Sequence, residues 1–147
     1  MNVKGQTLIA YADCFSGVSG DMFLGALLDV GLKLDHLQEE LAKLDLEGYT
    51  LRSCKKQDQG INASRLEIEF GNSSRARSWK DIRSIISQSG LHGTVKEKSL
   101  RVFTCLAEAE AKIHGCPVDM VHFHEIGGLD SIIDIIGSVI GLQCLGI

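Results

Sequence analysis

Apolar and polar positions follow two different periods along this chain. Between residues 20 and 45, apolar residues recur every three or four positions, which predicts amphipathic helices over 20–31 and 34–45. Gly31 is a suitable stop for the first helix. The buried face of that helix is expected to carry five apolar residues at helical spacing: Met22, Phe23, Ala26, Leu27 and Val30.

After residue 47 the period of the apolar pattern changes to two residues. Over 48–59 and 61–70, apolar and polar residues alternate, so that Leu66, Ile68 and Phe70 share one face. Gly60 lies between the two segments. This pattern predicts an antiparallel pair of strands with one solvated face.

The remaining segments complete a mixed fold. Helices are expected over 78–89, 94–114 and 127–145, and short strands over 7–13 and 116–126. The resulting order, β-α-α-β-β-α-α-β-α, predicts the α/β (α+β) class: a two-layer sandwich in which about five helices pack on a small mixed sheet. No linker or repeat divides the chain, so residues 1–147 are expected to form a single domain.

Composition narrows the class of protein. The 147 residues are 44% hydrophobic, and the net charge of −4 comes with scattered basic residues, which argues against binding to nucleic acid. Five widely spaced cysteines favour free thiols in a reducing cytoplasm. No secretory signal is recognisable, so a cytoplasmic location is expected.

The most apolar stretch ends the sequence. It contains Asp134 and Gln143 and is short for a membrane span, so a buried helix is expected and no membrane association. An end in so apolar a context predicts a fragment of a longer protein or a covering partner. A homo-oligomer stays open as an alternative.

A His-x-His pair carries the clearest metal chemistry. If residues 121–126 are extended, His122 and His124 share one face while Val121, Phe123 and Glu125 share the other. Two imidazoles on one face of a strand can ligate one metal ion. Imidazole suits nickel, zinc, copper and iron.

Carboxylates lie near this pair in the sequence. Asp130 and Asp134 are four residues apart on the last helix, and Glu110 and His114 are four apart on the preceding one. Asp134 interrupts an apolar helix, where an unpaired carboxylate is costly, so it is expected to pair with a histidine or face a polar site. Asp130 and His114 also have a purely structural interpretation. Asp130 would be a favourable charge at a helix N-terminus, and His114 would contact only the last carbonyl groups of its own helix.

The loop "SGVSGD" (16–21) has two interpretations. A strand, a glycine-rich loop and a helix together form an anion cradle of backbone N–H groups, but a tight turn capped by Ser19 or Asp21 explains the glycines equally well. The lysine of a P-loop is absent. Asp13 and Asp21 bracket the loop, which would also suit a divalent cation beside a phosphate.

Three stretches together closely resemble the LarC family of nickel insertion proteins: "DCFSGVSGDMFLGALLDVG", "LAEAEAKIHG" and "VHFHEIGGLDSIIDIIG". The resemblance covers essentially the whole chain and implies the N-terminal domain of a longer enzyme. One departure is that Ala76 and Ser78 stand where many relatives are expected to carry histidines.

The resemblance also implies the reaction. Family members insert Ni²⁺ into a pyridinium dithiocarboxylate mononucleotide, forming carbon–nickel and sulfur–nickel bonds while CTP is hydrolysed, to make the nickel-pincer nucleotide of lactate racemase. CTP, with Mg²⁺ or Mn²⁺, is expected only in the C-terminal domain, which would be a partner of this one. The alternatives are a non-catalytic nickel-delivery module and, less favoured, a metal-dependent phosphoesterase.

Roles are then assigned to the candidate residues. The precursor mononucleotide is expected to place its phosphate on the loop through Ser16, Gly17, Ser19 and Gly20. The expected nickel ligands are His114, His122, His124, Asp130 and Asp134. The expected catalytic carboxylates are Asp13, Asp21 and Glu125.

Overall fold

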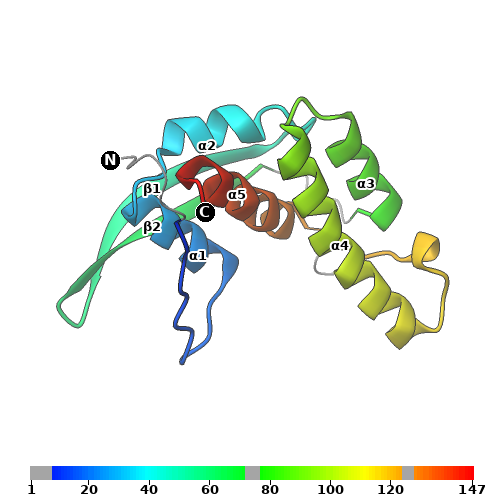
Figure 1. The fold of residues 1–147 in the computed structure, drawn as a ribbon, viewed down its shortest axis with the longest axis horizontal. Helices are drawn as coiled ribbons and strands as arrows, with labels where there is room; N and C mark the ends of the chain where they lie inside the picture. The colour runs from blue at the N-terminus through cyan, green and yellow to red at the C-terminus, as the bar shows by residue number, and fades with distance from the viewer. Residues whose placement is uncertain (1–7, 72–76, 124–127) are drawn as a thin grey trace.

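The computed structural model describes residues 8–71, 77–123 and 128–147. Five α-helices, a short 3-10 helix and one hairpin make up this part of the chain (Figure 1). In chain order the elements are α1 (Gly20–Asp29), α2 (Leu34–Leu41), β1 (Tyr49–Asp58), β2 (Ile61–Phe70), α3 (Trp79–Gln88), α4 (Gly93–His114), η1 (Val118–Met120) and α5 (Leu129–Leu145).

Helix α5 lies at the centre of the molecule, in contact with α1, α2 and α4 (Figure 1). Its Ile132, Ile133 and Ile136 are fully buried, as its apolar sequence requires. Gly141 lets α1 approach closely, because a Cβ atom there would lie only 2.7 Å from Leu27 Cδ1. Within the described segments, no helix is long and apolar enough to cross a membrane.

The hairpin forms as its alternation predicts. Its two strands pair antiparallel from Tyr49↔Phe70 to Asp58↔Ile61. The two-residue loop between them has positive φ at both Gln59 (47°) and Gly60 (84°), the arrangement of a type I′ turn. Leu51 and Leu66 are buried on the inner face of this hairpin.

The predicted mixed α/β class is confirmed, with five helices beside a small sheet. The sheet has two antiparallel strands over the described residues, and neither additional expected strand forms there. Residues 8–13 have no ladder partner. One reason is that α1 packs along β2: a Cβ at Gly25 would lie 2.2 Å from the Ser64 carbonyl oxygen, so α1 occupies this flank of the sheet.

The second expected strand, 116–126, is interrupted from its start. Pro117 precedes the 3-10 helix, and its carbonyl accepts the Met120 N–H at 2.8 Å. Only an isolated antiparallel bridge between Ser78 and His122 follows in the described residues. A proline with a fixed φ favours this turn over an uninterrupted strand.

The buried face expected for the first helix is only partly correct. Leu27 is buried and Phe23 is half-buried against the core, as expected, but Met22, Ala26 and Val30 are exposed, and Leu24, which was not expected there, is buried. Helix α1 is apolar around most of its circumference, so spacing alone does not decide which side faces the core. One apolar side of α1 is left without a partner in the described residues.

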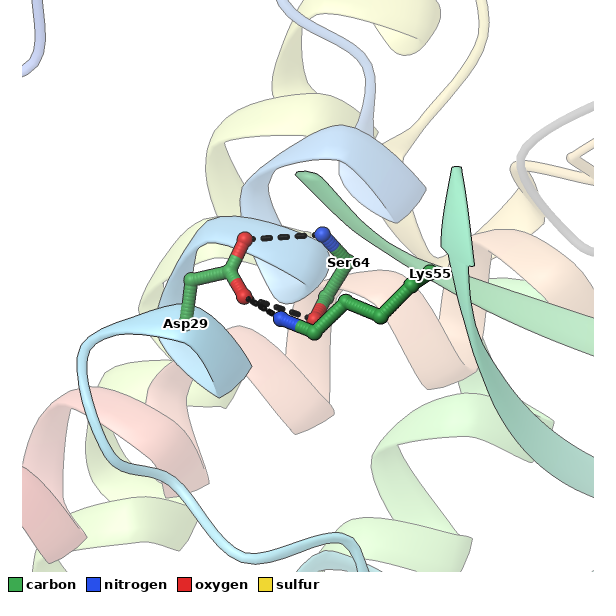
Figure 2. A network of polar contacts seen from close by, with 3 residues as sticks. All are labelled: Asp29, Lys55 and Ser64. Carbon is green, nitrogen blue, oxygen red and sulfur yellow. Dashed lines mark hydrogen bonds and ion pairs between the residues drawn. The ribbon is translucent and has the colours of Figure 1, made fainter. Parts of the chain in front are cut away.

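A polar clamp fixes the C-terminal end of α1 to the hairpin (Figure 2). The Asp29 carboxylate accepts hydrogen bonds from the Ser64 N–H and the Ser64 hydroxyl, both at 2.7 Å, and from the Lys55 ammonium group. The Lys55 and Ser64 hydrogen bonds hold the pKa of Asp29 well below its usual range. The clamp therefore favours the ionised carboxylate.

We expect Asp29→Asn to lower the midpoint of thermal unfolding by a few degrees at pH 7, because the amide cannot replace the charge-assisted bonds. The pKa of Asp29 is lowered on folding, so its stabilisation is present above the ordinary value of 3.8 and is lost as pH falls below it. Melting curves at pH 7 and pH 3 should show the difference from wild type shrinking in acid. Arg52→Gln, which breaks the exposed pair with Glu69, is the control and should change little.

Candidate functional site

The loop before α1 ends against α5. A Cβ atom at Gly20 would lie 2.3 Å from Asp134 Oδ2, so only glycine permits this approach. Gly17 has a different role: its φ is +86°, and its N–H closes a turn by donating to the Cys14 carbonyl at 2.9 Å. These two glycines are thus accounted for by a turn and by a close helix contact, without a ligand.

Three carboxylates meet at this junction of α1 and α5. Burial, together with the negative charges of Asp21 and Asp130, raises the pKa of Asp134 to about 6. The Oδ1 atom of Asp134 is buried and has no hydrogen-bond partner among the described residues. A buried oxygen without a donor, beside two more carboxylates, suits a proton or a cation.

The first turn of α1 is left without a side-chain cap. Ser19 occupies the N-cap position with extended backbone angles, but its hydroxyl donates to Asp21 Oδ1 instead of accepting a helix N–H. Capping by an oxygen of this kind is what ordinarily satisfies the first N–H groups. The first N–H groups of α1 therefore have no side-chain cap among the described residues, and the nearest negative charges are the carboxylates of Asp21 and Asp134.

Two basic side chains stand opposite this helix end. Lys56 and Arg65 belong to the hairpin, and with Ser19, Asp21 and Ser64 they line an open groove of about 620 Å³. Arg65 Nε lies 4.0 Å from Asp21 Oδ2. We call this groove between α1 and the hairpin the cationic groove. It puts positive charge next to the negative junction of α1 and α5.

The His-x-His segment is only partly described. Val121 and Phe123 are 2% and 1% exposed, and His122 between them is exposed, so the expected alternation is confirmed over these three residues. His124 and Glu125 lie outside the described residues. Ser78, where a histidine is expected in many relatives, forms its backbone bridge with His122.

His114 lies apart from this junction. Its Nε2 atom is 3.2 Å from Glu110 Oε2, so the predicted neighbours on α4 do meet. Figure 1 shows the C-terminal end of α4 well away from α1. In the described ranges, no group of three or more His, Cys, Asp or Glu side chains is arranged to hold a metal ion.

The expected site residues in the described segments therefore do not all lie in one place. Ser19, Gly20, Asp21, Asp130 and Asp134 come together at the junction of α1 and α5. By contrast, Asp13 and Ser16 are on the exposed segment 8–18, where Asp13 lines a different, apolar groove.

Lys56 and Arg65 were missed in the sequence, although a signal for them exists. The two-residue turn fixes the register, which pairs Cys54 with Arg65 and Lys56 with Ala63. In this register Lys56 and Arg65 are diagonal neighbours on one face. Their position opposite α1 depends on tertiary packing, which the hairpin pattern does not contain.

Comparison with known proteins places this α/β domain, with its acidic helix junction beside a cationic groove, in a family. The family model of nickel insertion proteins matches residues 10–147. The chain belongs to this nickel insertion protein family. No solved structure matches it significantly.

Relatives from several bacteria agree with this assignment. The chain is 51% identical over 138 residues to the pyridinium-3,5-bisthiocarboxylic acid mononucleotide nickel insertion protein of Desulfitobacterium hafniense, covering 94% of this chain and 34% of the relative. It is 52% identical to a putative nickel insertion protein of Syntrophobacter fumaroxidans (94% and 35%). It is 46% identical to the Staphylococcus saprophyticus protein of the same name as the first (93% and 35%). The chain thus spans about a third of the length of these relatives.

We expect Asp134→Asn to stabilise the protein at pH 7.5 and to have little effect at pH 4. The folded state raises the pKa of Asp134 from 3.8 to about 6, which means that it favours the neutral carboxyl. The stability that the neutral carboxyl contributes is complete below pH 3.8 and is lost as pH rises through 6. Because solvent screens a partly exposed group, the gain at pH 7.5 should be about 1 kcal/mol. Urea unfolding at the two pH values measures it. Asp35→Asn, on the exposed side of α2, is the matched control, and an equal gain there would contradict the assignment.

Proposed function

We propose that this chain is the nickel-handling N-terminal part of an enzyme that inserts Ni²⁺ into pyridinium-3,5-bisthiocarboxylic acid mononucleotide. Two relatives at 46–51% identity carry this substrate in their names. The reaction would depend on CTP, with Mg²⁺ or Mn²⁺, bound by the C-terminal domain of the whole enzyme. Its product would be the nickel-pincer nucleotide of lactate racemase.

The observation that carries this proposal is the buried Oδ1 atom of Asp134, which has no donor among the described residues. The adjacent Asp21 and Asp130 add negative charge, and carboxylates favour a divalent cation in such a place. The incoming Ni²⁺ would be held by Asp130 and Asp134 and by imidazoles from His122 and His124. Nickel accepts such nitrogen ligands readily. His114, which was also expected as a ligand, would not belong to this set, because its end of α4 lies away from α1 (Figure 1).

A carbon–nickel bond on the pyridinium ring replaces a carbon–hydrogen bond, so a proton has to leave the ring. We assign this proton to a carboxylate base, with Asp13, Asp21 and Glu125 as the candidates. Asp21 is supported best, since it stands between the acidic junction and the cationic groove. A base is effective when it lies within hydrogen-bond reach of the proton it removes.

The phosphate of the mononucleotide would bind beside the first turn of α1. The loop 16–20 supplies Ser16, Gly17, Ser19 and Gly20, and the uncapped helix end favours an anion. The cationic groove supports the same position, because Lys56 and Arg65 add charges that can pair with a phosphate. In this arrangement the phosphate and Ni²⁺ occupy adjacent sites of opposite charge.

One observation favours the alternative, a nickel-delivery module without chemistry of its own. The described residues contain no complete set of three metal donors, so a nickel site that uses them would take further ligands from outside these residues. Substrate sulfur atoms or another domain could supply them. If the rest of the relative's chain metallates the precursor without these residues, the delivery role is correct and the catalytic one is not.

We expect the chain to bind Ni²⁺ with nitrogen-rich coordination, measured by calorimetric titration and X-ray absorption. The double variant His122→Ala/His124→Ala and the single variant Asp134→Asn should each weaken binding by about 10–100-fold, the range typical of perturbed metal sites. His36→Ala, on α2 and outside the proposed site, is the control. Unchanged affinity in the double variant overturns the histidine ligands, and unchanged affinity in Asp134→Asn overturns the carboxylate.

We expect nicotinic acid mononucleotide, a pyridinium mononucleotide, to bind more tightly than its riboside, which lacks the phosphate. The double variant Lys56→Gln/Arg65→Gln should remove this difference, because it leaves the groove without its two cations. Chemical-shift titration by NMR measures both ligands. Arg52→Gln removes a charge from the same hairpin outside the groove and should bind like wild type. Equal affinity for mononucleotide and riboside in the wild type contradicts the phosphate site.

A further inference from the structure

Large apolar side chains stand in solvent along the segment 8–18. Ile9 is 85% exposed, Tyr11 89% and Phe15 90%. Figure 1 shows this stretch extending from the body of the molecule and returning to α1. A continuous row of such side chains is costly in water and is typical of a surface that another polypeptide covers.

The outer side of α1 continues the same apolar surface. Met22, Ala26 and Val30 face away from the core, and with segment 8–18 they line a groove of about 610 Å³. Leu145 and Ile147 form part of its wall. Asp13 alone carries a charged side chain among the described residues that line it. We call this the apolar groove.

The backbone of residues 8–13 lacks hydrogen-bond partners as well. The described residues offer no acceptor or donor to these peptide groups, and the nearest bond joins Gly17 N–H to the Cys14 carbonyl. The sequence "LIAYAD" has the residues and length of a strand. An extended segment with free peptide groups and apolar side chains is suited to pair with the edge of another sheet.

We propose that the apolar groove docks the part of the family polypeptide that lies outside the matched segment, and that residues 8–13 pair there as a β-strand. About two thirds of the Desulfitobacterium hafniense relative is of this kind, since the matched segment covers 34% of it. A covalently joined partner is present at an effective concentration near millimolar, which favours it over a second copy of the chain. This surface goes beyond the proposed nickel site: it follows the outer side of α1, whereas the nickel site lies where the first turn of α1 meets α5.

Hydrogen exchange followed by mass spectrometry tests the proposal. The two samples are the isolated chain and a chimera in which this chain replaces the matched segment of the Desulfitobacterium hafniense relative. Amides of residues 8–13 should exchange at the rate of free peptide in the isolated chain and at least about a hundredfold more slowly in the chimera, because strand pairing protects them. Rapid exchange in both samples overturns the proposal.

Two variants of the chimera sharpen the result. Ile9→Ser/Tyr11→Ser should restore rapid exchange in 8–13, whereas Ile61→Ser, an exposed apolar residue at the hairpin tip, should leave protection intact. Protection that rises with the concentration of the isolated chain, together with a doubled mass in light scattering, identifies a second copy and overturns the stated occupant. If the chimera does not fold, the segment aligned with 10–13 is measured in the full-length relative, where rapid exchange overturns the proposal equally.

Discussion

The burial of α5 is the constraint on which the rest of the structure depends. This helix is apolar on almost every side, so it needs neighbours all around it, and α1, α2 and α4 supply them. Close packing requires small residues at the contacts, and Gly137 and Gly141 receive leucine side chains from the surrounding elements. The hairpin is attached to this centre through α1, whose C-terminal end is fixed by the Asp29 clamp.

The same helix also carries an unfavourable polar group. A carboxylate at position 134 loses hydration against α1, and its Oδ1 atom gains no donor in return from the described residues. Glycine at position 20 makes room for it. An apolar residue at 134 would serve packing better, so the presence of a carboxylate supports the proposed binding role. Asp21 and Asp130 support the same role, because their negative charges increase the free-energy cost of ionising Asp134 instead of reducing it.

Much of this fold could be predicted from residue spacing, since the helices and the hairpin depend on local periods and on Gly60 as a turn residue. Residue spacing gave a wrong prediction where the buried side of a helix is decided by contacts with residues distant in the sequence. Met22 and Val30 were expected in the core because α1 is apolar on both sides, and only packing against α5 selects Leu24. The candidate carboxylates Asp130 and Asp134 follow from helical spacing, whereas their meeting with Asp21 depends on how α1 crosses α5. Lys56 and Arg65 were not predicted as site residues for the same reason, because their position opposite α1 depends on tertiary packing.

Helix α1 connects the two proposed surfaces. Its first turn belongs to the acidic junction and the cationic groove, and its outer side belongs to the apolar groove. Met22 lines both grooves, so a polypeptide that packs on the apolar groove also contacts one wall of the cationic groove. Docking would reduce the exposure of this wall to water and strengthen the electrostatic interactions beside it, since charges interact more strongly at lower dielectric. The proposed phosphate site would therefore bind its ligand more tightly in the full-length enzyme than in this chain alone.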